Sequence, residues 1–155
     1  MGAVTIRRAE QRDAGAIARF NIAMALETED KVLNSEVVAA GVNALLNTPA
    51  LGFYLVAEIE SQVVASLMIT TEWSDWRNGI FWWVQSVYVE PAFRRQGIYR
   101  RMYEAVKELA KTENVCGFRL YVERDNHRAQ ATYGTLGMEE TAYRLFEELR
   151  PSSTT

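Results

Sequence analysis

The sequence predicts a mixed α/β domain, and two observations carry this prediction. Three strand-like runs follow one another in the middle of the chain with only short polar turns between them, which is typical of an antiparallel meander. After the last of these runs the apolar residues change to a helical period, and another strand-like run follows that helix. The predicted order is β-α-α-β-β-β-α-β-α-β, with about four helices flanking one mixed sheet.

The chain length sets the expected number of domains. Its 155 residues, of which 48% are hydrophobic, fit one globular domain with a single core. We therefore expect residues 1–150 to form one domain and residues 151–155 to be a disordered tail.

The first elements are a strand and two helices. Residues 4–10 alternate briefly and suit a strand, and Asp13 then suits a helix N-cap. That helix extends to the acidic stretch ETED at residues 27–30. A second helix is predicted to start at Ser35 and to stop before Pro49, because proline disfavours helical geometry in the residue that precedes it.

The meander is predicted at residues 52–60, 63–73 and 80–90. Asn78-Gly79 is a strong turn signal, and Pro91 ends the third run.

Four tryptophans lie in the second turn and beside it. Alternation along the third run places Trp82 and Trp83 on opposite faces of the sheet, so one packs in the core and the other is available to line a cleft. Trp73, Asp75 and Trp76 could close over a cationic amine. A hairpin that simply packs, or one that forms a homodimer contact, remains an alternative.

The second half of the chain is predicted to contain a strand-helix-strand unit and a further helix. A helix with one apolar face follows Gly97, and residues 116–124 form the next strand. Asn126 caps a helix that ends at Gly137, and residues 138–148 alternate as a final strand that closes the domain.

Composition excludes several classes of function. The formal net charge of −3 argues against a broad nucleic-acid surface, which requires a basic face. Cys116 and His127 are the only cysteine and histidine, so we expect no disulfide framework and no metal site. No secretory signal and no apolar run long enough to cross a bilayer is present, so we expect a cytoplasmic protein without a membrane partner.

The stretch RRQGIYRR, residues 94–101, places basic side chains around one glycine where a helix begins. A helix N-terminus presents unpaired N–H groups and a partial positive charge, which together bind phosphates. Glycine lets the main chain approach the anion closely. The alternative is a single glycine in a loop whose arginines are solvated surface charges.

Two motifs in the correct order resemble the Gcn5-related N-acetyltransferase (GNAT) family. Arg94-Arg95-Gln96-Gly97-Ile98 follows a strand and matches the cofactor signature, although Tyr99 stands where the family has a small residue. Asn126 and Tyr133 have the family's seven-residue spacing, and Gly137-Met138 replaces its Gly-Phe. The resemblance covers most of the chain.

This resemblance implies that acetyl-CoA is the cosubstrate and lies between two parallel strands that splay apart. The main chains of Val87 and Val89 would bind its pantetheine arm, and one such N–H would polarise the thioester carbonyl. The implied cofactor-binding residues around the loop are Arg94, Arg95, Gln96, Gly97, Ile98, Tyr99 and Arg100. Asn126 is either a helix cap, a cofactor contact, or both.

The resemblance also implies direct acetyl transfer to a primary amine of a small molecule or peptide. Tyr133 would be the general acid for the leaving thiolate, with a core tyrosine as the alternative. Glu27, Glu29 and Glu72 are candidates for holding a water or attracting the cationic amine, with a solvated surface position as the alternative for each. A noncatalytic acyl-CoA-binding or sensing module, or an interaction domain built on the tryptophan hairpin, would lack this turnover.

Overall fold

The computed structural model describes residues 2–151, which divide into two compact units that are each described by themselves. The first unit extends through Leu120 and contains β1 (Val4–Arg8), α1 (Ala14–Glu29), α2 (Ser35–Leu46), β2 (Phe53–Ile59), β3 (Gln62–Ser74), β4 (Gly79–Val89), α3 (Ile98–Ala110) and β5 (Val115–Arg119). The second unit begins at Tyr121 and contains α4 (His127–Thr135). Among the described residues, no helix is long and apolar enough to span a membrane.

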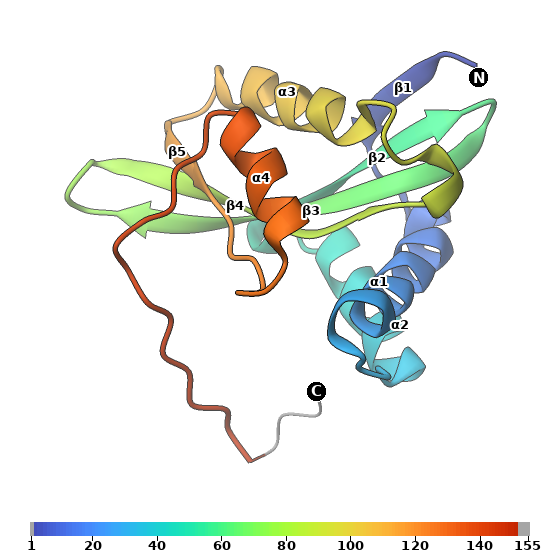
Figure 1. Cartoon of the computed structure of the whole chain (residues 1–155), viewed down its shortest axis with the longest axis horizontal. Helices are drawn as coiled ribbons and strands as arrows, with labels where there is room; N and C mark the ends of the chain where they lie inside the picture. The colour runs from blue at the N-terminus through green and yellow to red at the C-terminus, as the bar shows by residue number, and fades with distance from the viewer. Residues whose placement is uncertain (1, 152–155) are drawn as a thin grey trace. The chain divides into compact units, whose positions relative to one another are not determined.

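The first unit is built on a five-stranded mixed sheet with the order β1-β2-β3-β4-β5, as far as the described residues go (Figure 1). Neighbouring strands from β1 to β4 are antiparallel, and β5 runs parallel to β4. The predicted meander and the predicted parallel pair are both confirmed. The helix α3 connects β4 to β5, as a parallel crossover requires.

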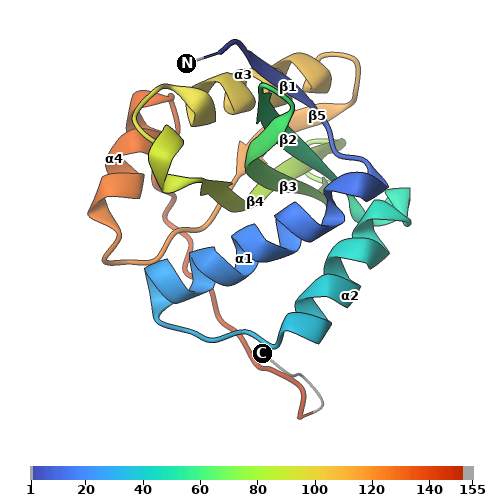
Figure 2. The same cartoon turned by 90° about the vertical axis from the view of Figure 1, so that its right-hand side faces the viewer.

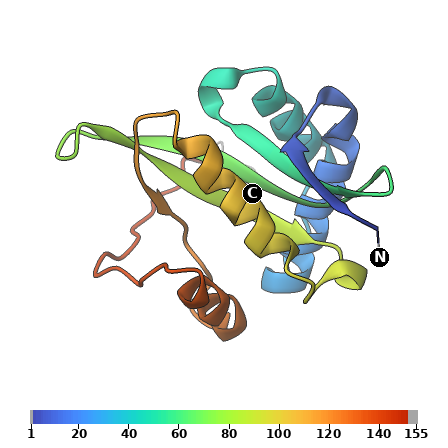
Figure 3. The same cartoon turned by 90° about the horizontal axis from the view of Figure 1, so that it is seen from above.

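Helices cover both faces of this sheet. Figures 1 and 2 show α1 and α2 on one face and α3 on the other, and Figure 3 shows α3 crossing the strands. The first core includes Ile17 of α1, Val42 of α2 and Val56 of β2. On the opposite face, Met102 and Val106 of α3 are fully buried. The predicted amphipathic helix after Gly97 is therefore confirmed.

Strand β4 contains a bulge that bends it. Ser66 pairs with Tyr88 and Met68 pairs with Gln85, so β4 carries one residue more than β3 between these two pairs. Ser86 lies in this interval and has a φ of 52°, in the left-handed region. A bulge of this kind increases the local twist and re-aims the residues after it.

The parallel pairing of β4 with β5 ends before the bulge. It begins at Ile80 opposite Val115 and finishes at Trp83 opposite Arg119, so the rest of β4, through Val89, has no β5 residue opposite it. The predicted splayed pair of parallel strands is thus confirmed, and it lies entirely within the first unit.

The predicted final strand at residues 138–148 is wrong. These residues follow α4 and form neither a helix nor a strand, and Tyr143, Leu145 and Phe146 are 75%, 70% and 92% exposed. Alternating side chains favour a strand only where a neighbouring strand accepts its backbone hydrogen bonds, and the second unit supplies no such neighbour among its described residues. Strand β5 is also shorter than predicted, since it ends at Arg119.

Of the predicted disordered tail, Pro151 forms a turn, and residues 152–155 lie outside the described part of the chain.

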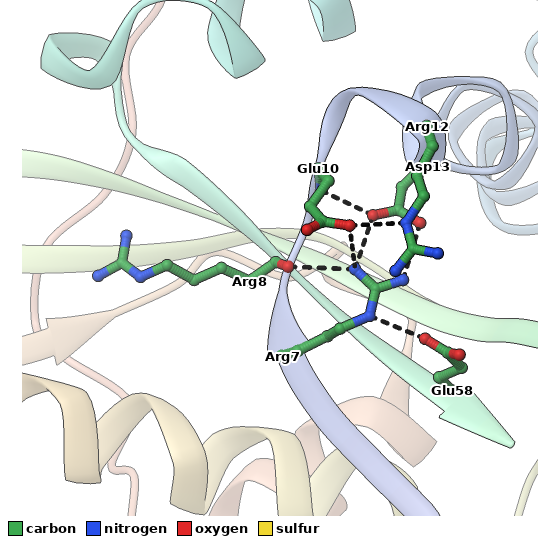
Figure 4. Close-up of polar contacts among 6 residues, drawn as sticks. All are labelled: Arg7, Arg8, Glu10, Arg12, Asp13 and Glu58. Atoms are coloured by element: carbon green, nitrogen blue, oxygen red, sulfur yellow. Dashed lines mark hydrogen bonds and ion pairs between the residues drawn. The ribbon is translucent and has the colours of Figure 1, made fainter. Parts of the chain in front are cut away.

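A charged network ties the first strand to α1 (Figure 4). Asp13 is only 4% exposed and accepts hydrogen bonds from Arg7 at 2.8 and 3.0 Å and from the Glu10 N–H at 2.7 Å. Arg7 also donates to Glu58 of β2 at 2.8 Å. Asp13 occupies the predicted N-cap position of α1, but its carboxylate binds these groups and makes no side-chain bond to the helix.

These contacts determine the protonation states of Asp13 and Arg7. Burial alone would raise the pKa of Asp13, but the hydrogen bonds from Arg7 and the Glu10 N–H, together with nearby positive charge, lower it below its ordinary value. The hydrogen bond with Asp13 raises the pKa of Arg7. Both groups are therefore charged at neutral pH.

Replacing Asp13 by asparagine is expected to lower the free energy of unfolding by about 2 kcal/mol at pH 7, because the buried charge-assisted hydrogen bonds are lost. Since folding lowers the pKa of Asp13, the stabilisation is fully present above about pH 4 and is lost as the pH falls through the folded-state pKa. Urea denaturation at pH 7 and near pH 3 measures both effects.

Asp30→Asn is the matched control, since Asp30 is exposed at the end of α1, and we expect a change under about 0.5 kcal/mol. Equal losses in the two variants, or a deficit of Asp13→Asn that does not shrink near pH 3, would contradict the role given to this network.

Candidate functional site

The N-terminus of α3 presents backbone N–H groups in the arrangement that favours anions. Gly97 is its N-cap residue with a φ of 78°, and Arg95 also has a positive φ, 63°. The Arg101 N–H donates to the Gly97 carbonyl and makes the first intrahelical bond, so the N–H groups of Ile98, Tyr99 and Arg100 precede the helical ladder. These amides lie at the positive end of the helix dipole, which favours phosphate.

The loop is open to solvent. Arg95, Gln96, Gly97 and Arg100 are all exposed, and a Cβ added at Gly97 would meet no atom within 4 Å. Tyr99 is half-buried, and its ring stacks on Tyr103, one turn further along α3, with 6.2 Å between ring centroids. The bulky residue at this position therefore packs along the helix, while its N–H stays in the first turn.

The side chain of Arg94 is engaged by other groups of the protein, so it is not available for phosphate binding alone. Its Nε donates to the Val89 carbonyl at 2.7 Å, and its two terminal nitrogens bind the carboxylate of Glu27. The guanidinium also lies 5.3 Å from the centroid of the Tyr88 ring. Arg94 thus connects the end of α1, the end of β4 and the start of the glycine loop.

The same ion pair changes the chemistry of Glu27. The hydrogen bond from Arg94 lowers the pKa of Glu27, which outweighs the opposing effect of burial. Reciprocally, the hydrogen bond with Glu27 raises the pKa of Arg94. A carboxylate with a lowered pKa is a weak proton acceptor at neutral pH, so this geometry favours a positioning role for Glu27.

The free edge of β4 leads into this loop. The Glu90 N–H donates to Val64 of β3 at 2.9 Å, so Glu90 faces β3. Successive residues of a strand direct their backbone groups to opposite edges, so the N–H of Val89 faces the side that β5 has left. Val87 follows the bulge residue Ser86 and lies within this part of the strand.

Glu72 lies at the point where β4 and β5 separate. Its Oε1 accepts hydrogen bonds from the indole N–H of Trp83 at 3.1 Å and from Arg119 at 2.8 Å. Trp83 and Arg119 form the last pair of the parallel ladder. Arg119 also lies over the Phe81 ring at 3.6 Å from its centroid. The structure therefore brings Glu72 to the mouth of the splayed strands.

Trp82 and Trp83 occupy opposite faces as predicted. Trp82 is 5% exposed and packs edge-on against Phe53, whereas Trp83 is half-buried and binds Glu72. Glu29, the third predicted glutamate, pairs with Lys31 at 3.3 Å on the exposed end of α1, and no described contact joins it to β4 or the glycine loop.

The second unit holds the other predicted site residues. The Asn126 side chain accepts the Ala129 N–H at 3.1 Å, so its predicted capping role is confirmed. Tyr133 is half-buried on α4, seven residues further on and thus on the same side of the helix. Burial raises the pKa of the Tyr133 hydroxyl, which stays protonated at neutral pH.

Two features of the site were not predicted. Arg119 was not singled out, because its value depends on Glu72, which lies 47 residues earlier in the chain. The bulge at Ser86 was also missed, since serine carries no sequence signal for a positive φ. The only available hint was the polar pair Gln85-Ser86 inside an otherwise apolar strand.

A family model and a curated relative identify the family of this chain. Residues 20–138 match the model of the acetyltransferase (GNAT) family. The thialysine N-epsilon-acetyltransferase of Bos taurus is 32% identical over 152 residues, which cover 90% of this chain and 86% of that protein.

Solved structures agree with this match. A possible acetyltransferase from Clostridium difficile 630 has a TM-score of 0.89 and 44% identity, and the match covers 95% of this chain and 97% of that chain. A predicted acetyltransferase from Clostridium acetobutylicum, solved with acetyl-CoA, has the same fold with a TM-score of 0.78 and 20% identity, over 94% of this chain and 96% of that chain.

Replacing Gly97 by alanine is expected to lower the free energy of unfolding by about 1 kcal/mol, because a Cβ is strained at this positive φ even where space is free. Gly97→Asn should cost less, since asparagine tolerates left-handed geometry. Gly15→Ala, inside α1 with equally open space, should be neutral or stabilising. Chemical denaturation gives all three values. If Gly97→Ala is as stable as the parent, or if Gly97→Asn is less stable than Gly97→Ala, then position 97 does not require left-handed backbone geometry.

Proposed function

Because the chain belongs to the acetyltransferase (GNAT) family, whose enzymes use acetyl-CoA, we propose that it transfers the acetyl group directly to a primary amine. The family match confirms the resemblance predicted from the glycine loop and the Asn126–Tyr133 spacing. The observation that carries the proposal is a pair of backbone donor groups on neighbouring elements, namely the edge of β4 that β5 does not pair and the amides that begin α3.

The residues of the first unit fit a nucleotide thioester. We assign its pyrophosphate to the amides from Gln96 to Arg100, with positive charge from Arg95 and Arg100. The pantetheine arm would bond to the N–H groups of Val87 and Val89. Arg94 then supports the site indirectly, since its guanidinium is engaged by Glu27 and the Val89 carbonyl.

Acetyl-CoA supplies an activated acyl group, and the chain has to orient it and stabilise charge on its carbonyl oxygen. A main-chain N–H on the free edge of β4 suits this purpose, because it is fixed by the strand and needs no reorganisation during the reaction. The side chains of Val87 and Val89 matter less than their amides.

Glu72 is the best-placed group for recognising the amine. Both of its described hydrogen bonds use Oε1, so Oε2 can accept a hydrogen bond donated by an incoming ammonium. Its side chain is 46% exposed, which allows a substrate to reach it. An alkyl ammonium with a pKa near ~10 is neutral in only about one molecule in a thousand at pH 7, so a carboxylate that holds the amine and receives its proton, directly or through water, assists the attack.

Tyr133 is proposed to supply the proton that the leaving thiolate takes up. As the carbon–nitrogen bond forms and the carbon–sulfur bond breaks, the leaving thiolate takes a proton from the phenol, which is then restored from solvent. The raised pKa of Tyr133 supports this role, because the hydroxyl carries its proton at neutral pH. The proposal requires this hydroxyl to reach the departing sulfur.

The acceptor class is tested by measuring release of free CoA with a panel of small amines, polyamines, amino acids and peptides. We expect turnover with at least one primary amine and none with matched alcohols. Binding of acetyl-CoA by calorimetry, without CoA release for any amine, would support an acyl-CoA-binding module and sink the transferase proposal.

Tyr133→Phe is expected to lower turnover by about 10²-fold at saturating acetyl-CoA, because it removes the general acid and keeps the ring. Its melting temperature should stay within a few degrees of the parent. Tyr143→Phe is the matched control, since Tyr143 is 75% exposed, and its rate should not change. An unchanged rate for Tyr133→Phe would rule out proton donation by this residue.

Glu72→Gln is expected to raise KM for the amine about tenfold with a much smaller effect on KM for acetyl-CoA, since it removes one charge-assisted contact. Glu27→Gln should act mainly on acetyl-CoA, because it releases Arg94 from its ion pair. Glu29→Gln is the surface control. If kcat/KM and its pH profile are unaltered in all three variants, none of these three glutamates takes part in the reaction.

A further inference from the structure

A row of three neighbouring residues crosses the sheet at the parallel strand pair. Glu72 of β3 lies opposite Phe81 of β4, and Phe81 lies opposite Gly117 of β5. Residues that lie opposite each other in neighbouring strands direct their side chains to the same face of the sheet. A Cβ added at Gly117 would lie 2.7 Å from Cε1 of Phe81, so the Phe81 ring occupies the space that a side chain would need there. The glycine therefore allows this ring to extend over β5.

Two guanidinium groups lie over the Phe81 ring. The Cζ of Arg119 is 3.6 Å from the ring centroid, and the Cζ of Arg77, in the turn between β3 and β4, is 5.1 Å from it. The ring itself is 7% exposed, whereas Arg77 is exposed and Arg119 is half-buried. Stacking on an aromatic face restricts a guanidinium without using its N–H groups. Both positive charges are therefore held at the ring that neighbours Glu72.

The ion pair between Arg119 and Glu72 leaves groups of both residues for a ligand. Arg119 uses Nη1 to donate to Oε1 of Glu72 at 2.8 Å, and a guanidinium has five N–H groups in all. Within the described part of the chain, no residue accepts a hydrogen bond from Nε or Nη2 of Arg119 or from the guanidinium of Arg77. The side chains of Arg119 and Glu72 are 26% and 46% exposed. A ligand that binds Oε2 of Glu72 would therefore also meet guanidinium donors.

We propose that the acceptor is an amino acid, whose amine is bound by Glu72 and whose carboxylate is bound by Arg119 and Arg77; this inference rests on the acetyl transfer proposed above. Each charge of such an acceptor meets a charge of opposite sign. Because Glu72 and Arg119 are in direct contact, the amine and the carboxylate are separated by only a few bonds. The proposal thus names a short amino acid as the substrate class.

The same charges select against a polyamine. Its first ammonium can bind Glu72, but its second would then lie near two guanidinium groups, and like charges repel at this range. A monoamine meets neither the attraction nor the repulsion at its far end. The expected order of acceptors is therefore amino acid, monoamine and diamine.

Three acceptors of matched length test this order. β-Alanine, propylamine and diaminopropane share a primary amine and differ at the other end, which is a carboxylate, a methyl group or a second amine. In an assay of CoA release we expect kcat/KM for β-alanine to exceed that for propylamine by about tenfold, and diaminopropane to be the poorest acceptor. γ-Aminobutyrate, butylamine and putrescine repeat the comparison with one more methylene. A preference for the diamine, or equal values for all three acceptors in both series, would overturn the proposal.

The two arginines are tested through the ratio of kcat/KM for β-alanine to kcat/KM for propylamine. Arg77→Gln removes one positive charge and leaves the ion pair with Glu72 in place, so the ratio should fall about threefold. Arg119→Lys keeps the charge but loses the planar set of donors, and the ratio should fall about tenfold. A variant that only unfolds more easily lowers both values of kcat/KM alike and leaves the ratio unchanged. Unchanged ratios in both variants would therefore overturn the proposal.

Two controls show whether the position of the charge matters. Lys107 places its ammonium 4.9 Å from the centroid of the Tyr103 ring on α3, so Lys107→Gln removes a cation from an aromatic ring outside the site. Asp75 is exposed in the same turn as Arg77, and no described contact joins its carboxylate to Phe81. Neither Lys107→Gln nor Asp75→Asn should alter the ratio. If either one alters it as much as Arg77→Gln does, the preference does not come from the charges on Phe81.

Gly117→Ala tests the ring as the support of both arginines. The added Cβ displaces the Phe81 ring, so the ratio should fall although no charge is changed. Gly41→Ala, in α2 with no atom within 4 Å of the added Cβ, is the matched control and should leave the ratio unaltered. A ratio that is the same in both glycine variants would contradict the role of the ring.

Calorimetry of the CoA-bound protein separates this inference from the acetyl transfer itself. β-Alanine should bind about tenfold more tightly than diaminopropane, whether or not acetyl transfer follows. If no amine releases CoA but this binding preference is present, the transferase proposal fails and the amino-acid site stands. If amines release CoA but β-alanine binds no more tightly than diaminopropane, or shows no binding, the acceptor class is wrong and the transferase proposal stands.

Discussion

The candidate site depends on the place where β4 loses its parallel neighbour. A strand inside a sheet satisfies its backbone groups on both edges, and β4 does so only as far as Trp83. Beyond that residue the bulge at Ser86 turns the strand while β3 continues to hold its other edge. The result is a set of backbone amides without partners in β5, which is the surface proposed here to bind the cofactor. The function proposed for this surface therefore depends more on the path of the backbone than on the identity of the side chains along it.

Arg94 links this surface to the helical layer. One guanidinium binds the last residue of β4, stacks near Tyr88 and forms an ion pair with Glu27 of α1. The loop that begins α3 is thus fixed at Arg94 to the end of β4 and to α1. Because α1 also packs against β4 through Phe20 and Tyr88, a shift of that helix would be transmitted to the glycine loop.

Local rules predicted most of the fold and part of the site. The glycine at position 97, the amphipathic helix after it and the Asn126 cap follow from backbone and periodicity arguments that need only a few residues. The contacts that determine the roles of the site residues join positions far apart in the sequence. Arg94 and Glu27 are 67 residues apart, so nothing in the local sequence indicates that this arginine is neutralised. Residues 138–148 were predicted as a strand from alternation alone, but a strand exists only with a neighbour to pair with.

The contact between Arg7 and Asp13 spans six residues, whereas the one between Arg7 and Glu58 spans 51. Closing a short loop costs less chain entropy and is faster than bringing distant segments together. The turn from β1 into α1 can accordingly acquire its native geometry before β2 is in place, so that the guanidinium is already oriented when its second carboxylate arrives. The first strand would then join the sheet as part of a preformed corner, in an order that follows the separation of the partners along the chain.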